Sequence, residues 1–384
     1  MKTPEIISNK EARNIILRSQ LLSSDRKFKS KYDIHKIIEK LSYLQIDTIS
    51  IVERSHHHIL WSRMNSYKRE MLDELIEKDK LIFEYWSHAA AYLPMSDYKF
   101  SLSRKRNFAL KNKTWGSANK RIIKLVLDRI RSEGPMMSRN FEDKKASDSG
   151  WWNWKPSKDA LDYLFHSGKL MIAKRQGFQK VYDLTERVLP AFADTSLPSD
   201  KEFYKFLIDR SLNSYGISRQ SEIMYLRKYD RKLFGEILKE MEEEKDIVRV
   251  KVSGLEDELF FATKKSLEIL NSKSSSKKFN ILSPFDNLII QRKRLKDIFN
   301  FDYQLECYVP QLKRKFGYFC LPVLYGDKFI GKIDAKSFRD KKTFLIIKQF
   351  TEEGVKLSQK MKSDYLKKIS QLGKFTDCTE IRGM

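Results

Sequence analysis

"PSKDALDYLFHSGKLMIAKRQGFQKVYDL", residues 156–184, has the pattern of a helix that runs directly into a β-hairpin. Three apolar side chains recur at helical spacing and would form one face: Leu161, Leu164 and Phe165. Ser157 is placed as the N-cap, and Gly168 is placed where the helix ends. The residues that follow predict two short strands around a Gln176–Gly177 turn.

A second amphipathic helix precedes this stretch. "NKRIIKLVLDRIRSEGP", residues 119–135, carries four apolar side chains on one face and stops at Gly134–Pro135: Ile123, Val126, Leu127 and Ile130. Helix, turn, helix and hairpin, in that order, is the outline of a winged helix. Three basic side chains lie near the tip of the predicted hairpin: Lys174, Arg175 and Lys180. Such a tip is a candidate DNA contact.

The same order of elements recurs later in the chain. Residues 199–212 predict a helix with Phe203, Phe206 and Leu207 on one side, and Gly216 breaks it. Two more helices are predicted over residues 218–228 and 231–245, followed by a hairpin around Ser253–Gly254. Two units of similar order predict tandem domains.

The two ends of the chain differ from this pattern. Near the N-terminus, helices are expected over residues 9–22 and 33–43; the polar stretch 271–278 reads as a linker. Beyond it come three β-rich runs and a last amphipathic helix, so the fold class expected is α+β: tandem winged-helix domains followed by a β-rich C-terminal module. The predicted domains are an N-terminal winged-helix-like domain, a second and a third winged helix, and the β-rich module: 1–115, 116–197, 198–270 and 279–384.

Charge is the strongest signal in the composition. Among 384 residues, 75 Lys and Arg face 51 Asp and Glu, a formal net charge of +24. Such an excess favours a polyanionic partner, nucleic acid or an anionic membrane surface. The alternative is a compositional bias of the genome. Because the basic residues are spread along the whole chain, a broad basic face on a folded body is the better interpretation.

The sequence also indicates the cellular compartment in which the protein is expected. No apolar run approaches the roughly 20 residues that span a bilayer, and the N-terminal residues contain no apolar signal core. The three cysteines (Cys307, Cys320 and Cys378) form no C-x-x-C pair, which argues against a disulfide framework and a zinc site. A reducing cytoplasm is the expected compartment.

"QIDTISIV", residues 45–52, is the candidate for chemistry. If this β-branched segment is extended, Gln45 and Asp47 point to the same side and Ile46 points to the core. An amide and a carboxylate side by side can hold one water, with Asp47 as its proton acceptor. The alternative is that Asp47 caps a turn through Thr48.

Four segments together resemble the YcaQ/AlkZ family of bacterial DNA glycosylases: "LSYLQIDTISIVERSHHHILWSR", "FEYWSHAAAYLP", "ILSPFDNLIIQRKRLKDIFNFDY" and "YVPQLKRKFGYFCLPVLYGDKFIGKIDAK". The similarity covers most of residues 5–350. The resemblance implies tandem winged helices and a monofunctional glycosylase of base excision repair, which hydrolyses the N-glycosidic bond of N7-alkylated purines, including guanines in interstrand crosslinks. Gln45-Ile46-Asp47 matches the Gln-x-Asp pattern of the YcaQ branch, which implies that Gln45 and Asp47 are catalytic.

This chemistry needs few groups. An N7-alkylated guanine is already cationic and departs as a neutral base without a general acid. A carboxylate can stabilise the oxocarbenium-like sugar and activate water. No metal or organic cofactor is implied, and since no lysine stands in a motif for Schiff-base attack, hydrolysis without strand cleavage is expected. The implied partner is double-stranded DNA with alkylated purines, with no membrane role and a monomeric state.

Several other residues are candidate DNA contacts: His56, His57, His58, Lys174, Arg175, Lys180, Tyr308, Lys313 and Arg314. The three histidines have two readings, satisfied core residues or contacts to phosphate or the lesion's sugar. Consecutive residues diverge too far for one metal ion. Tyr308 follows a strand-like "YQLEC", where the resemblance places a hairpin that enters DNA. The AlkZ branch has His at that position, so the departure bears on crosslink unhooking.

Three tryptophans and two site-flanking residues leave alternatives open. Trp86 and His88 either line the site or pack ordinarily. A cluster of tryptophans, Trp151, Trp152 and Trp154, is read as core packing rather than base stacking. From another functional class, the alternative is a non-catalytic winged-helix regulator, because most such domains only bind. Asp47 discriminates between them, since a pure binder gains nothing from a carboxylate that repels DNA.

Overall fold

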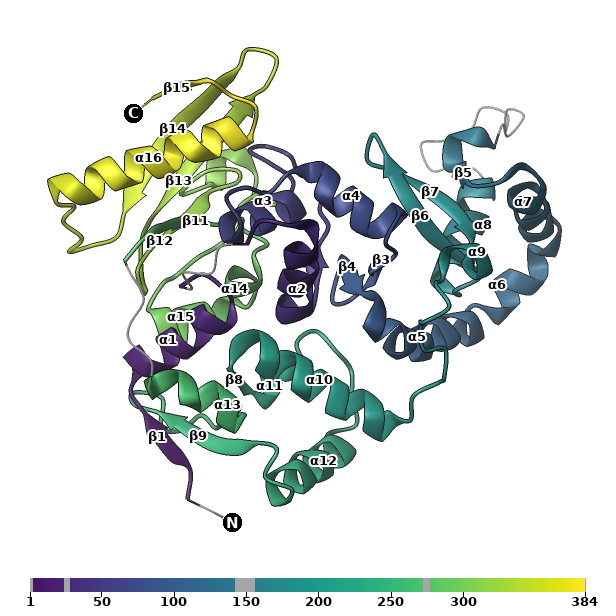
Figure 1. Cartoon of the computed structure of the whole chain (residues 1–384), viewed down its shortest axis with the longest axis horizontal. Coiled ribbons are helices and arrows are strands. Elements are labelled where there is room, and N and C mark those ends of the chain that lie inside the picture. The colour runs from purple at the N-terminus through teal and green to yellow at the C-terminus, as the bar shows by residue number, and fades with distance from the viewer. Residues whose placement is uncertain (1–2, 24–27, 142–155, 272–276, 384) are drawn as a thin grey trace. The chain divides into compact units, whose positions relative to one another are not determined.

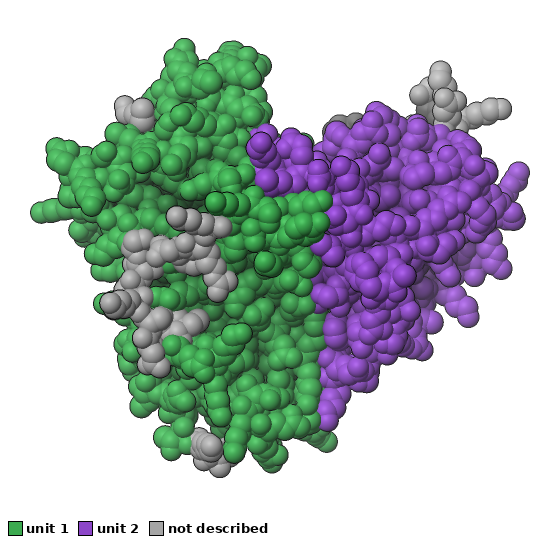
Figure 2. Space-filling model, in the orientation of Figure 1, with its two compact units in different colours: residues 1–67, 88–90, 204–384 green, residues 68–87, 91–203 purple. Residues whose placement is uncertain are grey.

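The computed structural model describes residues 3–23, 28–141, 156–271 and 277–383. The chain divides into two compact units, coloured separately in Figure 2. Unit 1 comprises residues 1–67, 88–90 and 204–384, and unit 2 comprises residues 68–87 and 91–203. The predicted tryptophan cluster at Trp151, Trp152 and Trp154 lies outside the described residues, as does most of the predicted linker.

Unit 2 contains the stretch that ends in the predicted hairpin. Its helices are α4 (Arg69–Glu77), α5 (Tyr98–Lys111), α6 (Lys113–Ala118), α7 (Lys120–Glu133), α8 (Pro156–His166) and α9 (Thr185–Val188). Its strands are β3 (Ile82–Trp86), β5 (Met136–Met137), β6 (Leu170–Gln176) and β7 (Gln179–Leu184), and β4 (Ala90–Pro94) begins at the boundary. Helices α7 and α8 share one apolar core with the sheet β5-β7-β6.

The predicted hairpin is confirmed, with its turn one residue later than expected. Gln176 pairs with Gln179, so the loop is Gly177–Phe178, and both of its residues have positive φ. Two positive φ angles are those of a type I′ turn, whose twist matches that of the strands. Ser157 is not the N-cap of α8, because the helix already begins at Pro156. The fixed φ of proline suits the first helical position.

Unit 1 carries the remaining elements. Its helices are α1 (Asn9–Ser19), α2 (Lys31–Leu41), α3 (Ser55–Arg63), α10 (Asp200–Tyr215), α11 (Gln220–Ile223), α12 (Arg231–Glu243), α13 (Lys264–Leu267), α14 (Asn287–Ile290), α15 (Arg292–Phe299) and α16 (Gln359–Phe375). Its strands are β1 (Glu5–Ile7), β2 (Leu44–Gln45), β8 (Ile217–Arg219), β9 (Val248–Val252), β10 (Phe260–Ala262), β11 (Phe279–Ile281), β12 (Leu321–Tyr325), β13 (Lys328–Phe338), β14 (Thr343–Thr351) and β15 (Glu380–Arg382). Its short 3-10 turns are η3 (Glu268–Asn271) and η4 (Gln311–Lys313), whereas η1 (Met95–Asp97) and η2 (Ser138–Asn140) lie in unit 2.

One sheet of unit 1 contains the second predicted hairpin. Strands β9 and β10 pair antiparallel around the predicted turn, and the sheet order is β1-β9-β10-β8. The helix predicted over residues 218–228 is wrong for most of its length, because residues 217–219 pair with β10 and only α11 remains helical. The buried face of α10 is also different from that predicted, with Tyr204, Leu207 and Ile208 inside and Phe206 only partly buried.

The C-terminal part of unit 1 matches the predicted meander. Strands β12, β13 and β14 pair antiparallel in succession within the five-stranded sheet β11-β12-β13-β14-β15. The last helix, α16, begins at Gln359 with Ser358 as its N-cap and contacts β11 and β15 of this sheet (Figure 1). The strand expected at residues 303–307 is not formed, and those residues adopt irregular structure.

Helix α2 ends earlier than predicted, and this determines where the candidate segment starts. Ser30 and Asp33 form a capping box at its N-terminus. At the other end Ser42 has φ 71, a left-handed conformation that cannot continue a helix. The chain therefore leaves the helix two residues before the predicted end at residue 43, and Leu44 lies in β2 next to Gln45.

Candidate active site at Gln45 and Asp47

The segment after β2 lies within unit 1 and is only briefly extended. Gln45 ends the strand with 5% of its surface exposed, and Ile46 is buried. The Ile46 amide donates to the Ala90 carbonyl oxygen at 2.8 Å. Asp47 follows in irregular structure and is partly exposed. The side-chain amide of Gln45 is thus buried, whereas solvent can reach the carboxylate of Asp47, two residues later.

The Asp47 carboxylate combines the two roles considered for it. Its Oδ1 accepts a hydrogen bond from the backbone amide of Ile49 at 2.6 Å. Asp47 therefore caps the turn, but through Ile49 and not through Thr48 as expected. Its Oδ2 accepts no hydrogen bond from the residues that the structure describes. Burial raises the pKa of the Asp47 carboxyl, and the Ile49 hydrogen bond partly offsets this. One oxygen therefore fixes the side chain while the other is available as a base.

Gln45 is oriented by His88. The distance between His88 Nε2 and Gln45 Oε1 is 3.1 Å, and because an amide oxygen can only accept, the imidazole must donate. This contact occupies the amide oxygen of Gln45, so its NH2 group is the part left to bind another molecule. Gln45 thus offers hydrogen-bond donors, while Asp47 offers an acceptor.

His88 is itself held in the neutral state. Its ring is edge-on to Tyr43 at 5.0 Å and to Tyr225 at 5.7 Å between centroids. Burial, together with the charge of Arg227, lowers the pKa of His88 to about 4. At neutral pH the imidazole is uncharged, and donation from Nε2 leaves the proton off Nδ1.

The loop between β2 and α3 is fastened by side chains and by the C-terminal sheet. Ser55 Oγ donates to the Gln45 carbonyl oxygen at 2.9 Å. The Ser337 amide donates to the Ile51 carbonyl oxygen at 2.9 Å. Arg339 donates to the Val52 carbonyl oxygen at 2.7 Å. Fixed backbone on both sides of Asp47 is what a preorganised catalytic group requires.

The three histidines lie on α3 and differ in exposure. His56 and His58 are buried, with 2% and 0% of their surface exposed, and His58 Nε2 lies 2.9 Å from the Ile281 carbonyl oxygen. Burial lowers the pKa of His58 to about 4. His57 is partly exposed, and its Nδ1 lies 2.7 Å from the Tyr67 hydroxyl. His57 is thus the most exposed of the three histidines, and their role in DNA contact stays a prediction.

The irregular segment that contains Tyr308 is built around one buried carboxylate. Glu306 accepts hydrogen bonds from three backbone amides, at 2.9, 2.8 and 3.0 Å: Lys315, Phe316 and Gly317. Tyr308 is 82% exposed and Leu312 is 100% exposed on the segment that these bonds close. Burial and then the charge of Asp47 raise the pKa of the neighbouring Cys307 thiol. The tertiary fold therefore brings this exposed tip within the electrostatic field of Asp47.

The predicted basic contacts have different environments. Lys174 and Lys313 are exposed. Arg175 forms two hydrogen bonds to the buried Glu84 carboxylate, both at 2.8 Å, so its guanidinium is committed to an internal ion pair. Lys180 is partly exposed and lies 3.8 Å from the same carboxylate. Arg314 donates to the Val309 carbonyl oxygen at 2.8 Å and so braces the Tyr308 segment.

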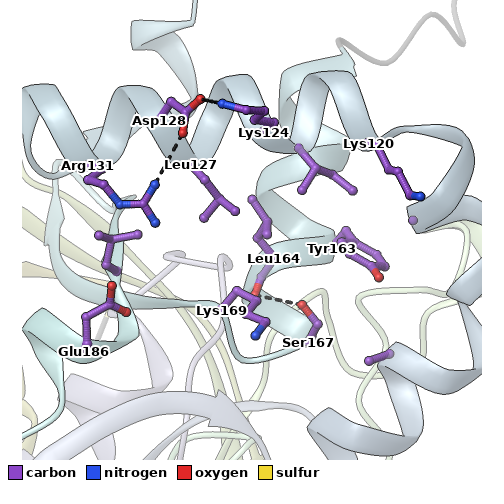
Figure 3. Close-up of a pocket in the computed structure, with 14 residues that line it drawn as sticks. Lys120, Lys124, Leu127, Asp128, Arg131, Tyr163, Leu164, Ser167, Lys169 and Glu186 are labelled. Atoms are coloured by element: carbon purple, nitrogen blue, oxygen red, sulfur yellow. Dashed lines mark hydrogen bonds and ion pairs between the residues drawn. The ribbon is translucent and has the colours of Figure 1, made fainter.

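A separate pocket of about 780 Å³ lies within unit 2, between α7 and α8 (Figure 3). Its apolar wall includes Leu127 and Leu164, and Asp128 at its edge is paired with Lys124 and with Arg131, the latter at 3.3 Å. A carboxylate already shared by two cations is a poor general base. We therefore place the candidate chemistry at Asp47 and not in this pocket.

Two further absences concern only the described part of the chain. Within it, no three His, Cys, Asp or Glu side chains converge as metal ligands. None of its helices is both long and apolar enough to cross a membrane. Trp86, the other residue expected near the site, lies in unit 2, where Arg104 is 5.5 Å from its ring centroid.

Tyr225, Arg227 and Cys307 are site residues that the sequence did not indicate. Each lies far along the chain from Asp47, and Tyr225 and Arg227 lie in a segment without a local motif. Their proximity to His88 or Asp47 arises only when the chain folds.

We expect His88→Ala to slow any reaction that depends on Asp47 and Gln45 about tenfold, since one hydrogen bond that orients Gln45 is lost. His88→Gln, which keeps a donor at the position of Nε2, should restore most of the rate. Single-turnover rates should be compared with those of Gln45→Ala. Because both residues act through one hydrogen bond, the double variant should be no slower than Gln45→Ala alone. Additive losses would contradict this coupling.

Comparisons with known proteins bear on the family and the fold of this chain. A family model described as DNA glycosylase AlkZ-like matches residues 38–368. Among solved structures, the DNA glycosylase AlkZ from Streptomyces sahachiroi is similar, with a TM-score of 0.64 and 15% sequence identity, over 98% of this chain and 99% of that chain. At this identity the structural match shows the fold, and the family is shown by the model that spans most of the chain. The resemblance seen in the four sequence segments is thereby confirmed, and the chain belongs to the AlkZ-like DNA glycosylase family.

Proposed function

We propose that this protein is a monofunctional DNA glycosylase that hydrolyses the N-glycosidic bond of N7-alkylated purines in double-stranded DNA. Two observations support the proposal: Asp47 Oδ2 accepts no hydrogen bond from the described residues, and His88 orients the side-chain amide of Gln45, two residues before Asp47. These two groups can hold one water molecule between an acceptor and a donor.

The proposed reaction breaks the bond between N9 of the purine and C1′ of the sugar. The purine leaves with the bonding electron pair, which cancels the positive charge that alkylation placed on the ring. Asp47 stabilises the oxocarbenium-like sugar electrostatically and accepts a proton from the attacking water. The Gln45 NH2 group donates to the oxygen of that water. The sugar gains a hydroxyl at C1′, and the strand stays intact.

The raised pKa of Asp47 fits the role of a base. A carboxyl whose pKa is raised by burial holds an accepted proton better than an exposed one. The partial exposure of the side chain leaves room for water and for the sugar.

We further infer that two sets of elements act as winged-helix DNA-binding domains. In unit 2, α7, β5, α8 and the β6–β7 hairpin follow one another (Figure 1). In unit 1, the order is α10, β8, α11, α12 and the β9–β10 hairpin. Lys174 near the first hairpin tip, and Lys313 next to Leu312, are exposed cations suited to phosphate. The four-domain division expected from the sequence remains a prediction.

The test is an excision assay on a duplex that carries one N7-methylguanine. We expect release of the free base, with strand scission only after alkali treatment reveals the abasic site. Borohydride should trap no covalent protein–DNA adduct, since the proposed mechanism forms no Schiff base. A duplex with an N7-guanine interstrand crosslink tests the wider substrate range in the same assay. Binding to DNA without release of either base would contradict the proposed function.

A further inference from the structure

The turn at residues 224–227 of unit 1 exposes a leucine in an unfavourable backbone conformation. The Arg227 amide donates to the Met224 carbonyl oxygen at 3.0 Å, which closes the turn. Leu226, inside it, has φ 54 and is 73% exposed. The left-handed conformation crowds the Cβ atom of any residue except glycine. Exposure also forfeits the hydrophobic gain that burial of a leucine would give.

The positive φ and the exposure of Leu226 both oppose folding. This combination distinguishes Leu226 from other exposed leucines and from other residues with positive φ. Single exposed apolar side chains are common on protein surfaces. Leu366, 45% exposed, is an example that sits within the regular helix α16. Leu21 also has a positive φ, but it is buried and contributes to the interior. Glycine or asparagine would satisfy the Leu226 turn at lower cost.

The turn is fixed directly beside the candidate active site. The ring of Tyr225 lies 5.7 Å from that of His88, which in turn donates to Gln45. The Tyr225 hydroxyl donates to the Ile290 carbonyl oxygen at 3.4 Å, and Met224 is buried. The residues before Leu226 thus anchor the turn, and its apolar tip is one residue away from a ring that contacts the catalytic constellation.

The charges around the tip suit one kind of partner. Arg227 lies close enough for its charge to lower the pKa of His88, and Lys228 is exposed. An apolar side chain with cations beside it matches the requirements of a duplex, in which phosphates surround stacked bases. Proteins that open base steps use apolar side chains for this purpose, because such a wedge replaces the lost stacking contacts.

We propose that Leu226 is a wedge that enters the base stack of duplex DNA next to the damaged nucleotide. The inference rests on the proposed function, because it assigns to Leu226 the opening of the stack that gives Asp47 access to C1′. The unfavourable conformation and the exposure, which cost stability in the free protein, are offset when the side chain is buried between bases.

The experiment uses the full chain and a duplex that contains 2-aminopurine next to a stable abasic analogue. Unstacking of 2-aminopurine raises its fluorescence, so wild-type protein should increase the signal on binding. Leu226→Gly and Leu226→Asn should lose most of that increase, and Leu226→Met, which keeps an apolar wedge, should retain it. Excision of N7-methylguanine under single-turnover conditions should slow about tenfold or more in the Gly and Asn variants.

Two controls separate the wedge from a structural role. Leu366→Ala removes an exposed leucine elsewhere in unit 1 and should leave the fluorescence response unchanged. Lys245→Gly relieves another exposed residue with positive φ, 65, and measures the stability that such relief gives. Leu226→Gly should raise the melting temperature to a similar extent while it weakens the response.

The outcomes decide the inference independently of excision. A lower melting temperature for Leu226→Gly would show that the leucine supports the fold, and the wedge would be abandoned. An undiminished fluorescence response in the Gly and Asn variants, or none in the wild type, overturns it as well. If the wild type unstacks 2-aminopurine through Leu226 but releases no N7-methylguanine, the proposed function fails while the wedge stands.

Discussion

Asp47→Asn is expected to slow excision of N7-methylguanine by about two to four orders of magnitude, the usual range for loss of a general base. Asparagine keeps an oxygen that can accept the Ile49 hydrogen bond, so the turn should persist. What disappears is the negative charge beside the sugar and the proton acceptor for water. The measurement is a single-turnover time course with saturating enzyme, which reports the chemical step.

Stability and DNA binding are the controls for this variant. Because burial raises the pKa of Asp47, the charged form is disfavoured in the folded state relative to solvent. Loss of the charge at neutral pH should therefore leave the melting temperature unchanged or slightly raised. Affinity for undamaged duplex should be equal or tighter, since an anion has left the surface that meets phosphates. An unfolded Asp47→Asn protein would mean that turn capping is the main role of Asp47.

The pH dependence follows from the same shift. The base works only when it is deprotonated, so the wild-type rate should rise with pH through the pKa of Asp47, which lies above its ordinary value of 3.8. The Asn variant should lack this rise. If the Asn variant excised N7-methylguanine at the wild-type rate at every pH, Asp47 would have no role in the mechanism.

Asp286→Ala is expected to lower the free energy of unfolding by about 3–5 kcal/mol. Arg63 contacts the Asp286 carboxylate through both terminal nitrogens, at 2.7 and 3.0 Å, and both side chains are 0% exposed. Removal of the carboxylate leaves the guanidinium buried without its counter-charge. It also removes the oxygen that caps α14 at the Leu288 amide, 3.0 Å away. Urea or guanidinium denaturation at equilibrium measures the loss.

A matched pair on the surface supplies the control. Lys239 and Glu243 form an i, i+4 ion pair on α12 with side chains 72% and 68% exposed. Glu243→Ala should change the free energy of unfolding by less than about 0.5 kcal/mol. The double variant Arg63→Met with Asp286→Leu should recover much of the stability, because no charge is then left buried. Equal losses for Asp286→Ala and Glu243→Ala would contradict this account.

This ion pair also matters for the candidate site. Arg63 is the last residue of α3, whose first residue, Ser55, holds the carbonyl oxygen of Gln45. The ion pair that fixes the position of α3 therefore also helps to fix the position of Gln45.

Elements whose contacts are local could be predicted from the sequence alone. The α7 and α8 helices and the β6–β7 hairpin follow from apolar periodicity and from glycine positions, because those signals act within a few residues. Apolar periodicity gave a wrong prediction where a segment pairs with a strand far along the chain. Residues 217–219 pair with β10, so the helix expected there is reduced to α11.

Gln45 and Asp47 could be nominated from the sequence, but their properties were decided by the tertiary structure. The donor that orients the Gln45 amide is His88, and the burial that raises the pKa of Asp47 comes from the folded chain around it. The anchored turn that carries Leu226 is placed beside His88 through Tyr225. Hydrogen-bond direction and desolvation depend on which atoms are close in space, and residues so far apart in the chain become neighbours only when it folds.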